Sequence, residues 1–161
     1  MSKQFVVPIS DEKRRLKELK YQLYTNGYHS EEDNIWSCYI IDPNNDNWSI
    51  SGVHANAKST HEMELIAIIE GLEWILYKYT SDIQKHVRIS LFSNSIYSIN
   101  LLKEWLKIWK TEGWTTRPNS YLFERLDNIT LNCILTPKWI PEKSCEYSIN
   151  CDNIINDMIT K

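Results

Sequence analysis

The chain has 161 residues and a mass of 19.1 kDa, which suits one domain with its own core and excludes two ordinary domains. Apolar residues make up 42% and charged residues 24%, so the chain can bury enough apolar surface to fold, and global disorder is excluded. A net charge of −3 excludes the diffuse positive field of a non-specific nucleic-acid or membrane binder, so any such binding needs a local patch.

The apolar runs and the cysteines indicate an intracellular protein that does not enter a membrane. The longest apolar runs, such as residues 65–69, are far shorter than the ~20 residues that span a bilayer. Charged residues from Asp11 to Arg15 interrupt the region where a signal peptide would need an apolar core. The four cysteines contain no CxxC pair, and a chain of this size needs no covalent staples, so we expect reduced thiols.

Hydrophobic periodicity predicts an α/β domain over residues 18–161, preceded by a charged N-terminal extension over residues 1–17. The first part of the domain predicts three strands in an antiparallel meander. They are expected at residues 19–25, stopping at Asn26-Gly27, and at residues 35–41 and 48–54, with a strong turn at residues 42–46 between the last two.

The rest of the chain predicts helices that alternate with two further strands. Ser59-Thr60-His61-Glu62 is typical of a capping box, and the apolar residues after it predict a helix over about residues 60–79. The remaining elements are expected at residues 87–93 (strand), 96–106 (helix, before a break at Gly113), 118–131 (helix), 133–140 (strand) and 148–159 (helix). Helical crossovers join the last two strands to the meander, which predicts a five-stranded mixed sheet flanked by helices.

Five short motifs follow one another along these elements. They are Tyr24-Thr25-Asn26-Gly27, Met63-Glu64-Leu65, Phe92-Ser93-Asn94-Ser95, the tryptophan-rich stretch 105–127 and Cys151-Asp152. In this order they resemble type 1 ribonuclease H over nearly all of residues 18–160. That family has, in turn, a Thr-Asp-Gly strand end, a Met-Glu-Leu on its first helix, a Thr-Asp-Ser strand end, a basic handle region and a last carboxylate. The resemblance implies the RNase H-like fold.

The resemblance also implies four acidic positions that converge on two magnesium ions and cleave the RNA strand of an RNA–DNA hybrid. Carried over by position, the four are Asn26, Glu64, Asn94 and Asp152. Two of them are amides, so the formal ligand charge falls from −4 to −2. We therefore expect the metal site formed by Glu64 and Asp152 to be weak or vacant. No cofactor is expected unless the protein is active, in which case Mg²⁺ or Mn²⁺ would serve.

A third departure lies in the loop before the last helix, where the resemblance implies a histidine near Glu142 or Lys143 and the chain has none. Exchange of aspartate for asparagine is nearly isosteric, so the fold should survive the two changes at Asn26 and Asn94. The combination predicts a pseudo-enzyme with a degenerate active site.

The resemblance also places a candidate nucleic-acid surface on the handle and beside Gly27. Its residues are Lys103, Lys107, Lys110, Trp105, Trp109, Trp114 and Tyr28. Two acids, Glu104 and Glu112, dilute the positive charge, and each missing cation weakens backbone binding. Competing interpretations remain open: helix packing for the three tryptophans, and a simple turn residue for Asn26. His61 is expected to be a surface residue.

Three functions remain open at this point. The first is a catalytically silent module that binds RNA, an RNA–DNA hybrid or proteins of a ribonucleoprotein. The second is a genuine ribonuclease H in which engineering changed two active-site aspartates to asparagine. The third is a protein-interaction subunit of a large assembly whose former active face touches no nucleic acid.

Overall fold

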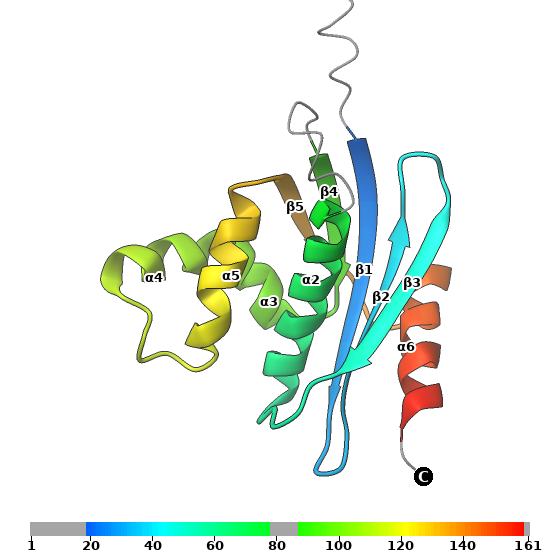
Figure 1. Ribbon diagram of the computed structural model, residues 1–161, viewed down its shortest axis with the longest axis horizontal. Helices are drawn as coiled ribbons and strands as arrows, with labels where there is room; N and C mark the ends of the chain where they lie inside the picture. The colour runs from blue at the N-terminus through cyan, green and yellow to red at the C-terminus, as the bar shows by residue number, and fades with distance from the viewer. Residues whose placement is uncertain (1–18, 78–86, 160–161) are drawn as a thin grey trace, which may run out of the picture.

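The described part of the chain is built around one sheet with the strand order β3-β2-β1-β4-β5 (Figure 1). The structure is a computed structural model, which describes residues 19–77 and 87–159; the predicted extension over residues 1–17 and the end of the predicted helix 60–79 lie outside these ranges. The strands are β1 (Leu19–His29), β2 (Asn34–Ile41), β3 (Asn47–Val53), β4 (Val87–Ser93) and β5 (Ile134–Trp139). The helices are α2 (Thr60–Tyr77), α3 (Ile96–Asn100), the π-helical turn η1 (Leu101–Trp105), α4 (Leu106–Glu112), α5 (Ser120–Thr130) and α6 (Glu146–Met158).

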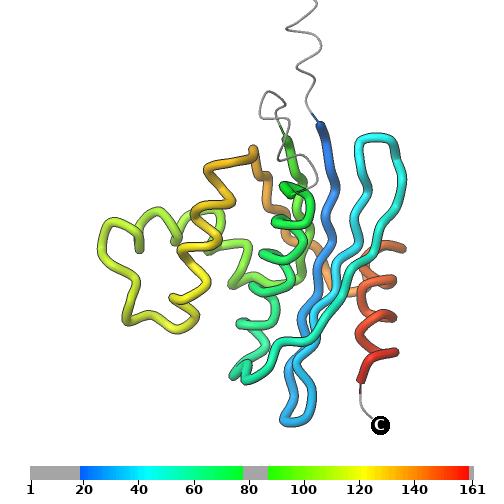
Figure 2. Tube along the Cα trace, in the orientation of Figure 1, coloured from blue at the N-terminus to red at the C-terminus, as the bar shows by residue number. Residues whose placement is uncertain are grey.

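The sheet is mixed, as predicted. β2 pairs antiparallel with both β1 and β3, whereas β4 pairs in parallel with β1 and β5. Helices α2 to α5 lie on one face of the sheet and α6 lies on the other (Figures 1 and 2). The prediction of a five-stranded mixed sheet with helical crossovers is therefore confirmed.

The main core lies between the sheet and α2. This helix is buried around most of its circumference because β1 and β2 cover one side and α5 covers another. Met63, Leu65 and Ile68 are completely buried, as is Leu23 of β1. Burial of such side chains contributes roughly 1.5–3 kcal/mol each, so packing rather than helix propensity holds α2 in place.

The first strand continues beyond its predicted end at Asn26-Gly27. Asn26 pairs with Ser37 and His29 pairs with Asn34, so the antiparallel ladder carries β1 four residues further than residue 25. The interpretation of Asn26 as a turn residue is therefore wrong. The turn forms at residues 30–33 instead, where the backbone N–H of Ser30 donates to the carbonyl of Asp33 at 2.8 Å.

Some helix boundaries also differ from the prediction. The helical segment after β4 ends at Glu112, before the predicted break at Gly113 (φ +88°), but it contains the π-helical turn η1, which was not predicted. α5 begins at Ser120 rather than at Pro118, and α6 begins at Glu146 rather than at residue 148. The N-terminus of α6 was missed because its cap is Cys145, whose backbone N–H donates to the Ser148 hydroxyl at 3.1 Å. Cysteine is not among the preferred cap residues.

The described residues contain no helix long and apolar enough to cross a membrane. All four cysteines are free thiols.

Candidate functional site

The four positions that the resemblance singles out lie at one end of the sheet. Asn26 is on β1, Asn94 directly follows β4, Glu64 is on the second turn of α2 and Asp152 is on α6. Asn26, Asn94 and Asp152 line one cavity together with residues of the loop 140–143, whereas Glu64 is not part of its lining. The structure therefore brings three of the four positions together around one cavity.

Glu64 is held beside this group by a close backbone approach at Gly27. A Cβ atom at Gly27 would lie 2.4 Å from the backbone nitrogen of Glu64 and 2.4 Å from the carbonyl carbon of Met63. Only glycine leaves room for β1 and α2 at this distance. The Asn-Gly pair therefore serves the contact between strand and helix.

Helix α6 is anchored to the sheet through Cys151 and Tyr147, which precede Asp152. The Ser37 hydroxyl donates to the carbonyl of Cys151 at 2.9 Å, and the Cys151 thiol donates to the carbonyl of Tyr24 at 3.4 Å. The ring of Tyr147 lies 5.2 Å from that of Tyr24 and stacks on Tyr39 at 5.3 Å. These contacts hold α6 on the sheet so that Asp152 lies opposite Asn26 of β1.

The side chains of Asn26 and Asp152 are joined by a short hydrogen bond, in which the amide Nδ2 of Asn26 donates to Oδ1 of Asp152. The other carboxylate oxygen, Oδ2, is buried and has no hydrogen-bond partner among the described residues. Burial raises the pKa of the Asp152 carboxyl; the negative charge of Glu142 raises it further and Lys143 lowers it. The carboxylate is thus only half satisfied by the amide beside it.

Replacement of Asp152 by asparagine should stabilise the protein near neutral pH. The raised pKa means that the folded chain holds this proton more tightly than the unfolded chain, so the free energy of unfolding falls as the pH rises above about 3.8. Asp152→Asn removes the ionisable group, so this loss of stability at higher pH disappears, and the amide oxygen at position 152 still accepts from Asn26. We expect Tm near pH 7 to rise by a few °C, the shift that about 1 kcal/mol gives a domain of this size, and to change little near pH 3.

Differential scanning calorimetry at the two pH values measures both shifts. Asp157→Asn is the matched control, because Asp157 is on the same helix but exposed. Equal Tm changes for the two variants at neutral pH would show that burial of Asp152 is not the cause.

The Glu64 carboxylate lies beside the ring of His61. Its Oε1 atom is 3.1 Å from Nδ1 of His61, three residues earlier on the same helix. Burial raises the pKa of Glu64, and hydrogen bonds from His61 and Ser95 partly oppose that shift. His61 is exposed, as predicted, and its ring stacks on Tyr97 with the centroids 4.7 Å apart.

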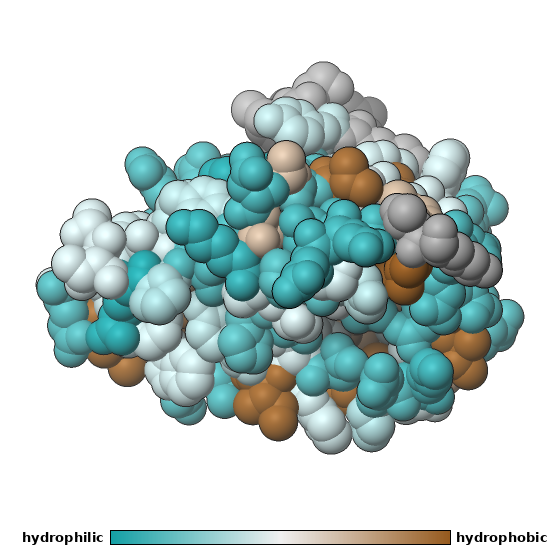
Figure 3. Space-filling view, turned by 90° about the horizontal axis from the view of Figure 1, so that it is seen from below, coloured by the Kyte–Doolittle hydropathy of each residue, from teal (hydrophilic) through white to brown (hydrophobic). Residues whose placement is uncertain are grey.

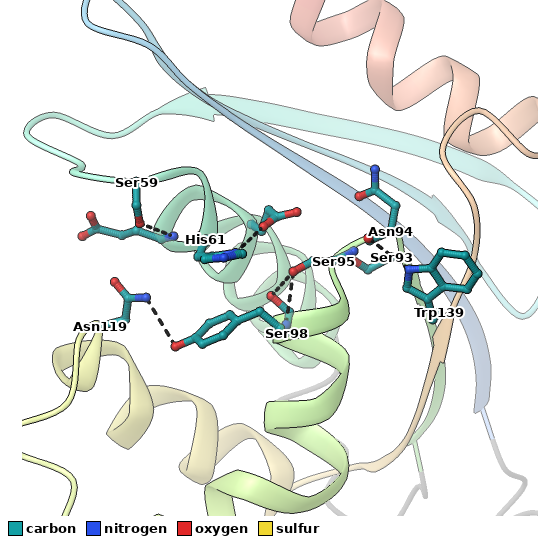
Figure 4. Close-up of polar contacts among 11 residues, drawn as sticks. Ser59, His61, Ser93, Asn94, Ser95, Ser98, Asn119 and Trp139 are labelled. Carbon is teal, nitrogen blue, oxygen red and sulfur yellow. Dashed lines mark hydrogen bonds and ion pairs between the residues drawn. The ribbon is translucent and has the colours of Figure 1, made fainter.

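The backbone around Asn94 is fixed by its serine neighbours. The Ser93 hydroxyl accepts from the backbone N–H of Ser95 at 3.0 Å, and the Ser95 hydroxyl accepts from that of Ser98 at 3.1 Å, which caps α3. The carbonyl of Asn94 accepts from Nε1 of Trp139 at 3.1 Å (Figure 4). These bonds leave the amide side chain of Asn94 at the cavity.

The lysines of the candidate nucleic-acid surface lie on η1 and α4. Lys103 and Lys107 are exposed, and so is Lys110, whose Nζ is 2.7 Å from Oδ2 of Asp127 on α5. Tyr28 is half-buried on β1, where it pairs with Ile35 of β2. The candidate surface thus has two separate parts. Tyr28 lies beside Gly27 on β1, and the lysines lie on η1 and α4, which form the handle.

The three tryptophans of the handle are partly buried and pack against the core. Trp105 stacks on Trp109 with the centroids 5.5 Å apart, and both Trp109 and Trp114 lie 5.7 Å from Phe123 of α5. The guanidinium of Arg117 lies over Trp109 at 4.0 Å from its centroid. Helix packing therefore accounts for their position, and a contact with nucleic acid remains a prediction.

Glu62 makes a buried contact that the sequence did not predict; its side chain is only 7% exposed. The hydroxyl of Tyr121 on α5 donates to Oε2 of Glu62, and Oε1 accepts from the backbone N–H of Lys58 at 2.6 Å. The Ser59 hydroxyl accepts from the backbone N–H of Glu62 at 3.1 Å, so half of the predicted capping box is present. The spacing from Ser59 signalled the cap, but nothing local indicated Tyr121.

The surface at this end of the molecule is mostly hydrophilic, and hydrophobic side chains form separate small patches on it (Figure 3). Within residues 19–77 and 87–159, no three His, Cys, Asp or Glu side chains are grouped so that they could hold a metal ion.

The family model RNase H matches residues 18–159 of the chain. Ribonuclease H of Ehrlichia ruminantium (strain Gardel) is 27% identical over 150 residues, which cover 88% of this chain and 96% of that protein. Ribonuclease H of Prosthecochloris aestuarii is 32% identical over 120 residues, covering 70% and 76%.

Two solved structures share the fold. RNase H1 from the halophilic archaeon Halobacterium salinarum NRC-1 superposes with a TM-score of 0.62 at 13% identity, covering 86% of this chain and 98% of that one. LC11-RNase H1, solved in complex with an RNA/DNA hybrid, gives a TM-score of 0.59 at 15% identity, covering 85% and 94%.

Proposed function

We propose, because this chain belongs to the RNase H family, that it is a catalytically silent member that binds RNA or RNA–DNA hybrids without cleaving them. The amide pair at the cavity carries the proposal: Asn26 and Asn94 line it together, and the resemblance of their motifs implies aspartates at these positions in the family. The scaffold around them is intact, so a binding surface persists where the charge needed for catalysis is missing.

The side chains at the four positions do not fit a pair of Mg²⁺ ions. An amide oxygen can contact a hard divalent cation but brings no negative charge, and of the four positions only Glu64 and Asp152 provide a carboxylate. One oxygen of Asp152 is occupied by the amide N–H of Asn26, a group that repels a cation. The Glu64 carboxylate accepts from His61. Each carboxylate thus has one oxygen engaged by a hydrogen-bond donor, and neither position 26 nor position 94 supplies a compensating negative charge.

Natural degeneracy is supported by the loop between β5 and α6. Residues 141–145 contain no histidine, although the resemblance implies one in this loop. Engineering of two aspartates alone would not have removed that histidine, so its absence favours natural change. The coding sequence of the natural gene tests this directly, since aspartate codons at positions 26 and 94 would identify the asparagines as engineered.

Binding of a hybrid should depend on salt through the handle lysines. Each phosphate that a lysine neutralises contributes about −0.9 to the slope of log K against log salt concentration on duplex DNA. The double variant Lys103→Ala/Lys107→Ala should therefore weaken hybrid binding and reduce the slope by about 2. Fluorescence anisotropy with a labelled RNA–DNA hybrid at several salt concentrations measures both quantities.

Lys20→Ala is the matched control, because Lys20 is an exposed lysine near the start of β1 and away from the handle. It should leave the slope unchanged. If the unaltered chain shows no hybrid or RNA binding even at low salt, the proposal fails and the protein-interaction subunit becomes the better description.

A further inference from the structure

The edge strand β3 lacks the features that normally protect a sheet edge. Its seven residues include Trp48, Ile50 and Val53 but no charged residue and no proline, and most of them are exposed. Natural edge strands usually carry charges, prolines or bulges, because their unpaired backbone N–H and C=O groups otherwise pair with another strand. The register with β2 is continuous, so no bulge interrupts this edge.

A groove runs between β2, β3 and α2 on the face of the sheet that α2 covers. It is lined by Trp36, Ile50, Glu70, Glu73, Trp74 and Tyr77. Trp48 extends the aromatic wall, since its ring lies 5.7 Å from that of Trp74. Trp48 and Tyr77 are 42% and 71% exposed, although both are large and apolar. Such a surface beside a pairing-competent edge offers sites for alternate side chains of an added strand.

The meander that carries this edge is strongly acidic. Residues 21–57 contain no Lys or Arg, and their exposed acidic residues, Glu31, Glu32 and Asp46, lie in the two turns; Asp42 is buried and accepts from Nε1 of Trp48 at 2.9 Å. In the groove, Arg125 pairs with both acids, at 2.5 Å from Glu73 and 3.6 Å from Glu70, so one negative charge remains there. An acidic surface repels the phosphate backbone and attracts basic segments.

We propose that β3 and the groove beside it bind an extended segment of a partner protein in which apolar and basic side chains alternate. The segment pairs with β3 as a sixth strand, its apolar side chains contact the groove, and its basic side chains face the acidic meander. This surface shares no residue with the cavity at Asn26, so the inference does not depend on nucleic-acid binding.

The test uses the full chain and a fluorescein-labelled peptide of about eight residues that alternates lysine with valine, roughly the length of one strand. A matched peptide alternates glutamate with valine. We expect the lysine peptide to bind about tenfold or more tightly than the glutamate peptide, as measured by fluorescence anisotropy. Amide hydrogen exchange followed by NMR should show new protection in β3, because strand addition engages its backbone N–H groups.

Two double variants test the role of charge at the edge. Ser49 and Ser51 are exposed on β3, so substitution there should leave the fold intact, which thermal melting checks. Ser49→Lys/Ser51→Lys should weaken binding of the lysine peptide about tenfold, whereas Ser49→Glu/Ser51→Glu, at the same positions, should preserve or strengthen it.

Five results would overturn the proposal, and the first four concern the surface itself. They are equal binding of the two peptides, equal loss in the two double variants, protection confined to residues outside β3 and the groove, and dimerisation through β3 seen by analytical ultracentrifugation. Stronger peptide binding after charge reversal of Lys13, Arg14 and Arg15 to glutamate would also overturn it, because the chain's own N-terminal residues would then be the occupant.

Discussion

Replacing Asn26 and Asn94 together by aspartate should raise the affinity of the protein for Mg²⁺ by about 100-fold or more. Loss of an outer partner of a metal ligand typically costs 10–100-fold in affinity, and here two direct ligand positions are at stake. In the unaltered chain Asn26 donates to Asp152, which keeps that oxygen from a cation. A carboxylate at position 26 would repel Asp152, and a divalent cation between them would relieve the repulsion.

Isothermal titration calorimetry with Mg²⁺ measures this change. The matched control is Asn153→Asp/Asn156→Asp, which adds the same charge to exposed positions of α6 outside the cavity. The control should shift the Mg²⁺ affinity only slightly. An affinity of the unaltered chain equal to that of the Asn26→Asp/Asn94→Asp variant would contradict the electrostatic argument.

Of the four possible glycine-to-alanine substitutions, Gly27→Ala should destabilise the protein most. The added Cβ would meet backbone atoms of Met63 and Glu64 at 2.4 Å, and backbone moves much less easily than the tip of a side chain. α2 cannot retreat, because Met63 and Leu65 on either side of the contact are completely buried. We expect Gly27→Ala to lower the free energy of unfolding by about 3 kcal/mol.

Urea denaturation measures this loss, with Gly113→Ala as the control. A Cβ at Gly113 would meet nothing within 4 Å, so only its left-handed φ of +88° opposes alanine there. With its ψ of 121°, Gly113 lies outside the left-handed helical well, and such backbone strain costs a residue with a side chain roughly 1–3 kcal/mol. A loss at Gly27 of about 1 kcal/mol or less would show that the approach of β1 to α2 is not the constraint.

Most of the fold could be predicted from the sequence because its signals are local. Alternation of apolar residues marks the strands, and the apolar spacing after Ser59 marks α2. The direction of the strands follows from the connections, since short turns join β1, β2 and β3 while helices lead to β4 and β5. The antiparallel and parallel pairings confirm these directions.

The errors came from contacts between distant parts of the chain. Asn-Gly is a strong turn signal, but pairing of Asn26 with Ser37 carries β1 through it. Likewise, the buried Glu62 looks like an ordinary first-turn acid until Tyr121 of α5 is placed against it. Neither partner can be identified from local sequence, because both contacts depend on the packed tertiary structure.

The candidate site divides in the same way. The motif order located its four positions, and three of them line one cavity. The hydrogen bond between Asn26 and Asp152, and the bond that His61 makes with Glu64, required the structure. The acidic residues of the meander can be read from the sequence. The groove beside them cannot, because it forms only when α2 packs beside β3.

The most direct measurement is the rate at which the unaltered chain cleaves the RNA strand of a labelled RNA–DNA hybrid in excess Mg²⁺ or Mn²⁺, under conditions in which binding of the hybrid is observed. The account predicts a bound hybrid that stays intact, with no cleavage above the metal-only background. Multiple turnovers of cleavage by the chain with Asn26 and Asn94 in place would contradict it.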